Sequence, residues 1–245
     1  MRALIHILQA EFLKQKKSIF AILCSLIVVS VPIFLIVKDL MIQSVPEDMD
    51  WIYTMVIMNS LVLSVMSGFY ITFLMQREYQ DHTLINILTA PVSRASFIVA
   101  KLLIWAIWYL LTVCLVAIVI IIGYRLLYPA SFDWSGVKMA LQFLAKNSGF
   151  IFVASIPVLW VTVLQRTLFY PSMLVTLIFT VIAMAGTQTS MSMLKLAIAV
   201  PWSAASIASL MSVSSIYFWV AVISVFLCGI IGIVLAIYSF VRQDQ

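Results

Sequence analysis

LLIWAIWYLLTVCLVAIVIIIGY, residues 102–124, decides the fold because it contains no Asp, Glu, Lys, Arg or His. An α-helix needs about 20 mainly apolar residues to cross about 30 Å of hydrocarbon, and this stretch is long enough. The whole chain of 245 residues is 64% hydrophobic and 9% charged, whereas the apolar share of a soluble domain is about 45–50%. The composition therefore predicts an all-α polytopic membrane protein.

Apolar runs of similar length recur along the chain and predict six transmembrane helices in a single transmembrane domain, 1–245. The expected spans are residues 18–37, 51–75, 102–124, 147–164, 168–186 and 216–240. The fourth span has two possible forms, because the preceding residues 138–146 carry charge. They form either an amphipathic segment that lies on the membrane or the outer end of a longer, tilted helix.

The distribution of basic residues predicts the orientation of the chain. With both termini on one side of the membrane, nine Lys and Arg residues fall on that side and five on the other. Cytoplasmic segments carry the excess of basic residues, so both termini and the polar segment 76–101 are expected in the cytoplasm of a multi-pass protein of the cell membrane. A basic inner face suits anionic membrane lipid rather than nucleic acid.

The expected spans contain no Asp, Glu, Lys, Arg or His. Ion-coupled transporters and proton relays place such residues at membrane depth, so no relay for an ion gradient is visible. The sequence also lacks the G-x-x-x-x-G-K-[ST] loop that cradles nucleotide phosphates and the His-Glu-x-x-His metal motif. We therefore expect no catalytic residue, metal site or cofactor in this chain, and energy for transport would come from another polypeptide.

The first 17 residues have an apolar face that contains Leu4, Ile5, Leu8 and Phe12. Such a pattern predicts an amphipathic helix over 1–17 that lies in the inner headgroup region. The alternative is a cytoplasmic flap that merely carries basic residues.

Small residues in the second expected span, Ser60, Ser64 and Gly68, recur every four positions. This spacing allows helices to approach closely in lipid. It indicates either a contact within the chain or the seam of a dimer.

Residues 187–215 are too apolar for an ordinary loop and too interrupted for a span, with Pro201 and Trp202 near the middle. They predict a re-entrant hairpin that dips into the outer leaflet, where irregular backbone needs cover from protein or a cavity. Pro201, Trp202, Ser203 and Ser206 are candidates for an outer gate. The alternative is a structural plug between the fifth and sixth spans.

The polar segment 76–101 separates the second and third spans and carries a recognisable order of residues. These are Glu78, Asp81, Thr83, Leu84, Pro91, Ser93, Arg94 and Lys101. In this order and position they resemble the corresponding residues of the permeases of type-2 ABC exporters, the ABC-2 family. Within that family the chain is most similar to the permease subunits of lantibiotic immunity and bacitracin-type exporters.

The resemblance implies a short cytoplasmic coupling helix in segment 76–101 that contacts a separate ABC ATPase dimer, which would bind ATP and Mg. The implied contact residues are Arg77, Glu78, Asp81, Thr83, Leu84, Ile87, Leu88, Pro91 and Arg94. It also implies a second permease subunit, identical or related, and export of an amphipathic substrate such as an antimicrobial peptide. The alternative is a membrane anchor or sensor that docks a cytoplasmic partner without transport.

Overall fold

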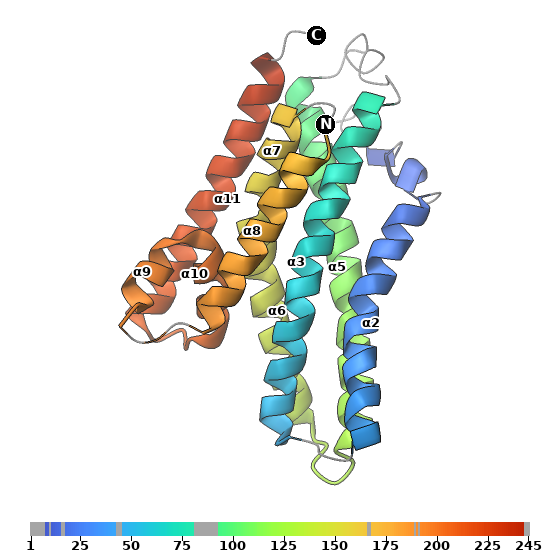
Figure 1. The fold of residues 1–245 in the computed structure, drawn as a ribbon, viewed down its shortest axis with the longest axis vertical. Helices are drawn as coiled ribbons and strands as arrows, with labels where there is room; N and C mark the ends of the chain where they lie inside the picture. The colour runs from blue at the N-terminus through green and yellow to red at the C-terminus, as the bar shows by residue number, and fades with distance from the viewer. Residues whose placement is uncertain are drawn as a thin grey trace.

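The computed structural model describes residues 8–9, 11–15, 18–42, 46–80, 93–165, 168–188, 190 and 192–242. Within these ranges the regular elements are all helices and no strand occurs (Figure 1). Six helical segments are long and apolar enough to cross a membrane. The prediction of an all-α protein with six spans is confirmed.

The spans alternate in direction along the bundle and follow one another in chain order. They are α2 (Ile19–Ile42), α3 (Asp48–Gln80), α5 (Arg94–Leu127), α6 (Trp134–Ser155) with α7 (Pro157–Gln165), α8 (Tyr170–Thr187) and α11 (Ile216–Arg242). Two short helices, α9 (Leu194–Ala199) and α10 (Pro201–Leu210), join α8 to α11. The end of α3, the start of α5 and the end of α11 lie at the same end of the bundle (Figure 1), which we call the terminal end.

Most of the helices are longer than the expected spans, because charged residues continue them. α3 runs to Gln80 and α5 begins at Arg94, so part of the predicted polar segment is helical. In the fourth span, α6 is continuous from Trp134, which matches the longer helix rather than a separate surface segment. The span is interrupted only at Ile156, directly before Pro157. The backbone nitrogen of proline carries no hydrogen and therefore cannot donate a helical hydrogen bond.

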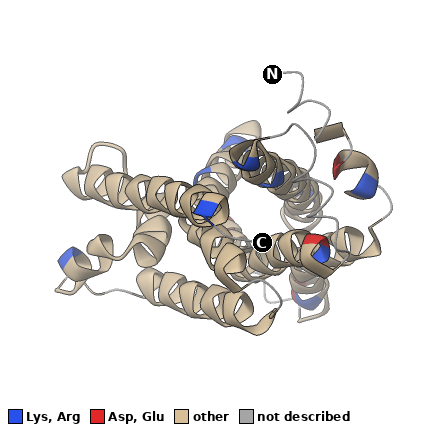
Figure 2. Cartoon of the chain, turned by 90° about the horizontal axis from the view of Figure 1, so that it is seen from above, with Lys and Arg blue, Asp and Glu red and all other residues tan. Residues whose placement is uncertain are grey.

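α3 and the α6–α7 pair form the centre of the bundle. In each, 56% of the most apolar 18-residue window is buried, against 22% to 33% in α2, α5, α8 and α11. α3 packs against α2, α5, α6, α7 and α8, and its Trp51 and Tyr70 are each 1% exposed. The outer helices expose many aliphatic side chains. In the cartoon seen along the bundle, most of the described chain is neither basic nor acidic (Figure 2), as expected for helices surrounded by lipid.

The small residues of α3 contact α8 within the same chain. The hydroxyls of Ser64 and Thr180 lie 2.9 Å apart, and a side chain at Gly68 would overlap Thr176. Ser60 is hydrogen-bonded to Asn147 of α6. Of the two interpretations of this small-residue pattern, the structure supports the contact within the chain.

Candidate functional site

Four charged residues gather at the terminal end of the bundle, from three segments that are distant in sequence. Glu11 and Lys14 come from the N-terminal segment, Glu78 from the last turn of α3, and Lys101 from the start of α5. Lys101 is 1% exposed, Glu78 is 2% exposed and Glu11 is 3% exposed. We call these four residues the ion cluster.

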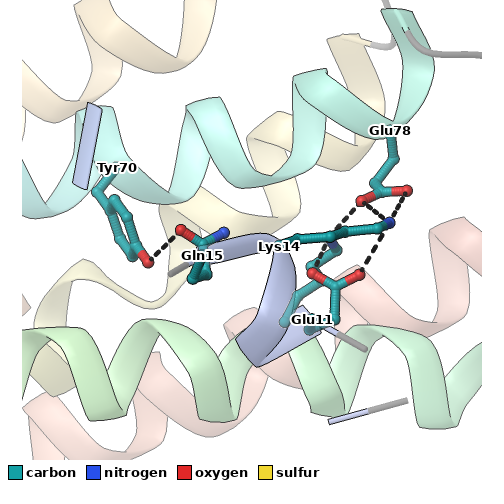
Figure 3. Close-up of polar contacts among 6 residues, drawn as sticks. Glu11, Lys14, Gln15, Tyr70 and Glu78 are labelled. Atoms are coloured by element: carbon teal, nitrogen blue, oxygen red, sulfur yellow. Dashed lines mark hydrogen bonds and ion pairs between the residues drawn. The ribbon is translucent and has the colours of Figure 1, made fainter. Parts of the chain in front are cut away.

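Lys101 is at the centre of the ion cluster. Its Nζ lies 2.7 Å from Glu11 Oε2 and 2.9 Å from Glu78 Oε1. Lys14 bridges the same two carboxylates from a half-exposed position, with its Nζ 3.0 Å from Glu78 Oε1 and 3.5 Å from Glu11 Oε1. Figure 3 shows Lys14 extending between Glu78 and Glu11. Each carboxylate therefore contacts both ammonium groups.

Helical periodicity explains why these charges point inward. Lys101 follows Phe97 by one turn and precedes Trp105 by one turn, and both rings are buried; residues four apart share one face of a helix. Its ammonium group also lies 5.2 Å from the centre of the Phe97 ring. Glu78 likewise extends the buried face of α3 that contains Leu74 and Met75. Glu78 thus lies at the end of the buried face of α3, whereas Lys101 lies between buried aromatic side chains on the inward face of α5.

The cluster is formally neutral, because two carboxylates face two ammonium groups. Burial lowers the pKa of Lys14, but the hydrogen bond to Glu78 and the charges of Glu11 and Glu78 raise it by more, so its pKa is above the ordinary value. Lys14 is therefore protonated at neutral pH. Removal of one member of a buried ionic group leaves an uncompensated charge, which makes the four residues mutually dependent.

Further hydrogen bonds join other helices at the same end. Tyr70 of α3 donates to the side-chain oxygen of Gln15 at 3.1 Å (Figure 3). Gln76 donates at 3.1 Å to the carbonyl of Leu168, two residues before α8. Arg94 donates to the carbonyl of Val241 at 2.9 Å, at the end of α11. Polar contacts thus connect α3 to the segments that precede α2 and α8, and they connect the start of α5 to the end of α11.

The ion cluster lies at the base of the segment that connects α3 to α5. Glu78 is two residues before the end of α3, and Lys101 is in the second turn of α5. Their contact of 2.9 Å fixes the two helices that carry residues 81–92.

Of the nine residues predicted to contact an ATPase, three lie among the described residues: Arg77, Glu78 and Arg94. Glu78 was expected to contact the ATPase, but its carboxylate is buried and paired with Lys14 and Lys101. We therefore assign it to the interior of this chain. Arg94 is half-buried at the start of α5, and Arg77 is half-buried near the end of α3. Outside the described residues lie Asp81, Thr83, Leu84, Ile87, Leu88 and Pro91.

Sequence reasoning missed the roles of Glu11 and Lys14. The N-terminal segment was predicted to bind the membrane surface through an apolar face, and residues 8–9 and 11–15 are indeed helical. Phe12 and Leu13 are 55% and 65% exposed, whereas Glu11 points inward. One signal was available, since an acid three residues before Lys14 can form an ion pair on one helix face. Insertion of this helix into the headgroup region remains a prediction.

The four residues proposed as an outer gate lie together on α10. Pro201 is the first residue of α10, and Trp202 Nε1 donates to the carbonyl of Ala154 in α6 at 2.9 Å. Ser203 Oγ donates to the carbonyl of Ala197 at 2.6 Å, and Ser206 is buried. Trp202 therefore contacts the fourth span. The hydroxyl of Ser203 instead connects α10 to α9.

Two comparisons relate the sequence of this chain to known transport proteins. The model of the family described as ABC-2 family transporter protein matches residues 7–183, more than half of the chain. A bacitracin transport permease protein, BCRB of Bacillus licheniformis, is 30% identical over 143 residues, which cover 56% of this chain and 63% of that protein. The family match includes the N-terminal segment, α3, α5 and every member of the ion cluster. The chain belongs to the ABC-2 family of transporter proteins.

Proposed function

We propose that this chain is the permease subunit of an ATP-driven ABC exporter in the cell membrane, with both termini in the cytoplasm. Membership of the ABC-2 family and six apolar spans support this function. The observation that carries it is the ion cluster, which holds together the two helices that flank residues 81–92. If a partner moves residues 81–92, the helices on either side must be held together for the movement to reach the spans.

ATP and Mg would be bound by a separate ATPase dimer. The apolar side chains Leu84, Ile87 and Leu88 would insert into a groove of each ATPase subunit, because buried apolar anchors supply most of the energy at an interface. Asp81 and Arg77 would fix the orientation through charge pairs at the rim. Movement of the ATPase would then pass through Glu78 and Lys101 to α3 and α5. A second permease subunit, identical or related, would complete the transmembrane unit.

The substrate that we propose is an amphipathic peptide with antimicrobial activity, exported as a form of immunity. The similar protein from Bacillus licheniformis is named as a bacitracin permease, which favours a peptide of this kind. The hairpin 187–215 would face the outer side of the membrane, where the peptide acts. An antimicrobial peptide that enters the outer leaflet would be removed from there before it damages the membrane.

Association with an ATPase tests this function directly. The tagged chain, purified from its own membrane, is expected to retain a protein that hydrolyses ATP and carries the G-x-x-x-x-G-K-[ST] motif. Leu88→Asp should abolish the association, because a charge would be buried in the apolar contact. Trp134→Asp is the matched control, since Trp134 is 80% exposed at the opposite end of the bundle. Absence of an ATPase from the wild-type preparation would refute the proposed function.

A further inference from the structure

A groove of about 500 Å³ lies between the helical N-terminal segment and α5. It is lined on one side by the N-terminal segment and on the other by α5, through Leu8, Gln9, Phe12, Leu13, Ile104 and Ile107. Of these six described residues only Gln9 is polar. The volume lies within the range of about 300–1,000 Å³ that is usual for sites of small ligands. The groove therefore has room for an apolar ligand of that size.

The groove begins beside the ion cluster and continues toward the apolar part of α5. Glu11, which contacts Lys101 at 2.7 Å, directly precedes Phe12 of the groove wall. Ile104 and Ile107 follow Lys101 by three and six residues, which places them about 5–9 Å further from the terminal end along α5. A ligand in the groove would thus have one end near the charged terminal end and the other beside apolar side chains. This geometry suits a molecule with a polar head and an apolar tail.

Both walls of the groove expose apolar side chains. Phe12 and Leu13 are 55% and 65% exposed, and Ile107 is 42% exposed. Glu11, on the opposite face of the N-terminal segment, is buried against Lys101. Charge therefore holds one face of this short helix, while its apolar face needs an apolar cover. In a membrane protein the acyl chain of a lipid can supply that cover.

The terminal end carries a surplus of positive charge, which favours an anionic head group. Among the described residues this end has two acidic side chains, both buried in the ion cluster, and five basic ones. The basic ones are Lys14, Arg77, Arg94, Lys101 and Arg242. The rest of the described chain is balanced, with five residues of each sign. Basic residues near a membrane surface attract anionic lipids, so the charge of this end is complementary to such a head group.

We propose that the groove binds one anionic phospholipid from the adjacent leaflet, with an acyl chain between Phe12 and Ile107 and the head group at the terminal end. In the orientation proposed above, this leaflet is the inner one. The bound chain holds the N-terminal segment against α5 and so keeps Glu11 in contact with Lys101. Such a lipid is distinct from the exported peptide, which we place on the outer side of the membrane.

Native mass spectrometry of the full chain in detergent tests the lipid site. The probes are phosphatidylglycerol and phosphatidylcholine with identical acyl chains. The wild type should bind one phosphatidylglycerol about fivefold more tightly than phosphatidylcholine, because of the basic surplus. Leu13→Gln and Ile107→Gln each place an amide in one wall of the groove and should weaken the binding of phosphatidylglycerol about tenfold. Both side chains are largely exposed, so both variants should fold.

Leu110→Gln is the matched control, since Leu110 is 62% exposed on α5 and does not line the groove. It should leave the affinity unchanged. Equal affinity of the wild type for the two lipids would overturn the anionic head group. Unchanged binding in both groove variants, or equal weakening in Leu110→Gln, would overturn the groove as the site.

A second measurement tests the link between the lipid and the ion cluster. Phosphatidylglycerol should raise the midpoint of thermal unfolding of the wild type, and it should do so less in Ile107→Gln, because the bound chain stabilises the contact of Glu11 with Lys101. Binding of the lipid without a rise in the midpoint would contradict this role.

Discussion

Replacement of Lys101 by Met is expected to lower the free energy of unfolding by about 3–5 kcal/mol, the usual cost of breaking a buried ion pair. The substitution leaves the buried carboxylates of Glu11 and Glu78 with a single half-exposed partner, Lys14. Met fills a similar volume, so the loss would come from charge rather than from a cavity. Unfolding of the purified chain in detergent, followed by circular dichroism, measures the change.

A compensating substitution separates charge balance from loss of contact. In Glu78→Gln with Lys101→Met, one carboxylate and one ammonium group remain, Glu11 and Lys14, and the cluster is neutral again. The double variant should therefore be more stable than the sum of the single effects predicts, because residues in one network are not independent. Strict additivity of the two losses would mean that the four side chains do not act as one ionic group.

The second large effect is expected at the contact between α8 and α10. A Cβ on Gly186 would lie 2.7 Å from the carbonyl oxygen of Ser203 and 2.8 Å from its Cα. Because these are backbone atoms, Gly186→Ala would force the two helices apart, at a cost of about 1–3 kcal/mol. The midpoint of thermal unfolding in detergent is the measurement.

Gly149→Ala is the matched control for this substitution. No atom lies within 4 Å of a Cβ added to Gly149 in α6, so the same change should stabilise the protein by up to about 1 kcal/mol through helix propensity. If both alanine variants unfold at the same temperature, α8 and α10 are not packed as closely as described.

The spans were predictable from sequence because length and apolar composition alone determine which segments can cross a membrane. Their ends were not, since α3 and α5 continue through charged residues as far as Gln80 and Arg94. Charged residues such as Glu and Lys are compatible with an α-helix. At the end of a span their side chains can form ion pairs or reach water. Hydropathy therefore predicts the apolar middle of a span but not the residues at which its helix begins and ends.

The ion cluster could not be found by reading along the chain. Glu11, Glu78 and Lys101 come from separate segments, and only the packing of the N-terminal helix against α3 and α5 brings them within hydrogen-bond distance. The resemblance to ABC-2 permeases marked Glu78 and Lys101 but gave them no common partner. The spacing of Ser60, Ser64 and Gly68 likewise predicted a close contact without saying that α6 and α8 provide it.

The most direct test of the account is ATP hydrolysis by the wild-type assembly and its Lys101→Met variant in nanodiscs, with and without bacitracin. We predict that the peptide stimulates hydrolysis in the wild type and that the variant, assayed below its unfolding temperature, loses the stimulation. That result would mean that the ion cluster transmits force between the ATPase and the spans. Equal stimulation in both would contradict the central claim, because coupling would then proceed without Lys101.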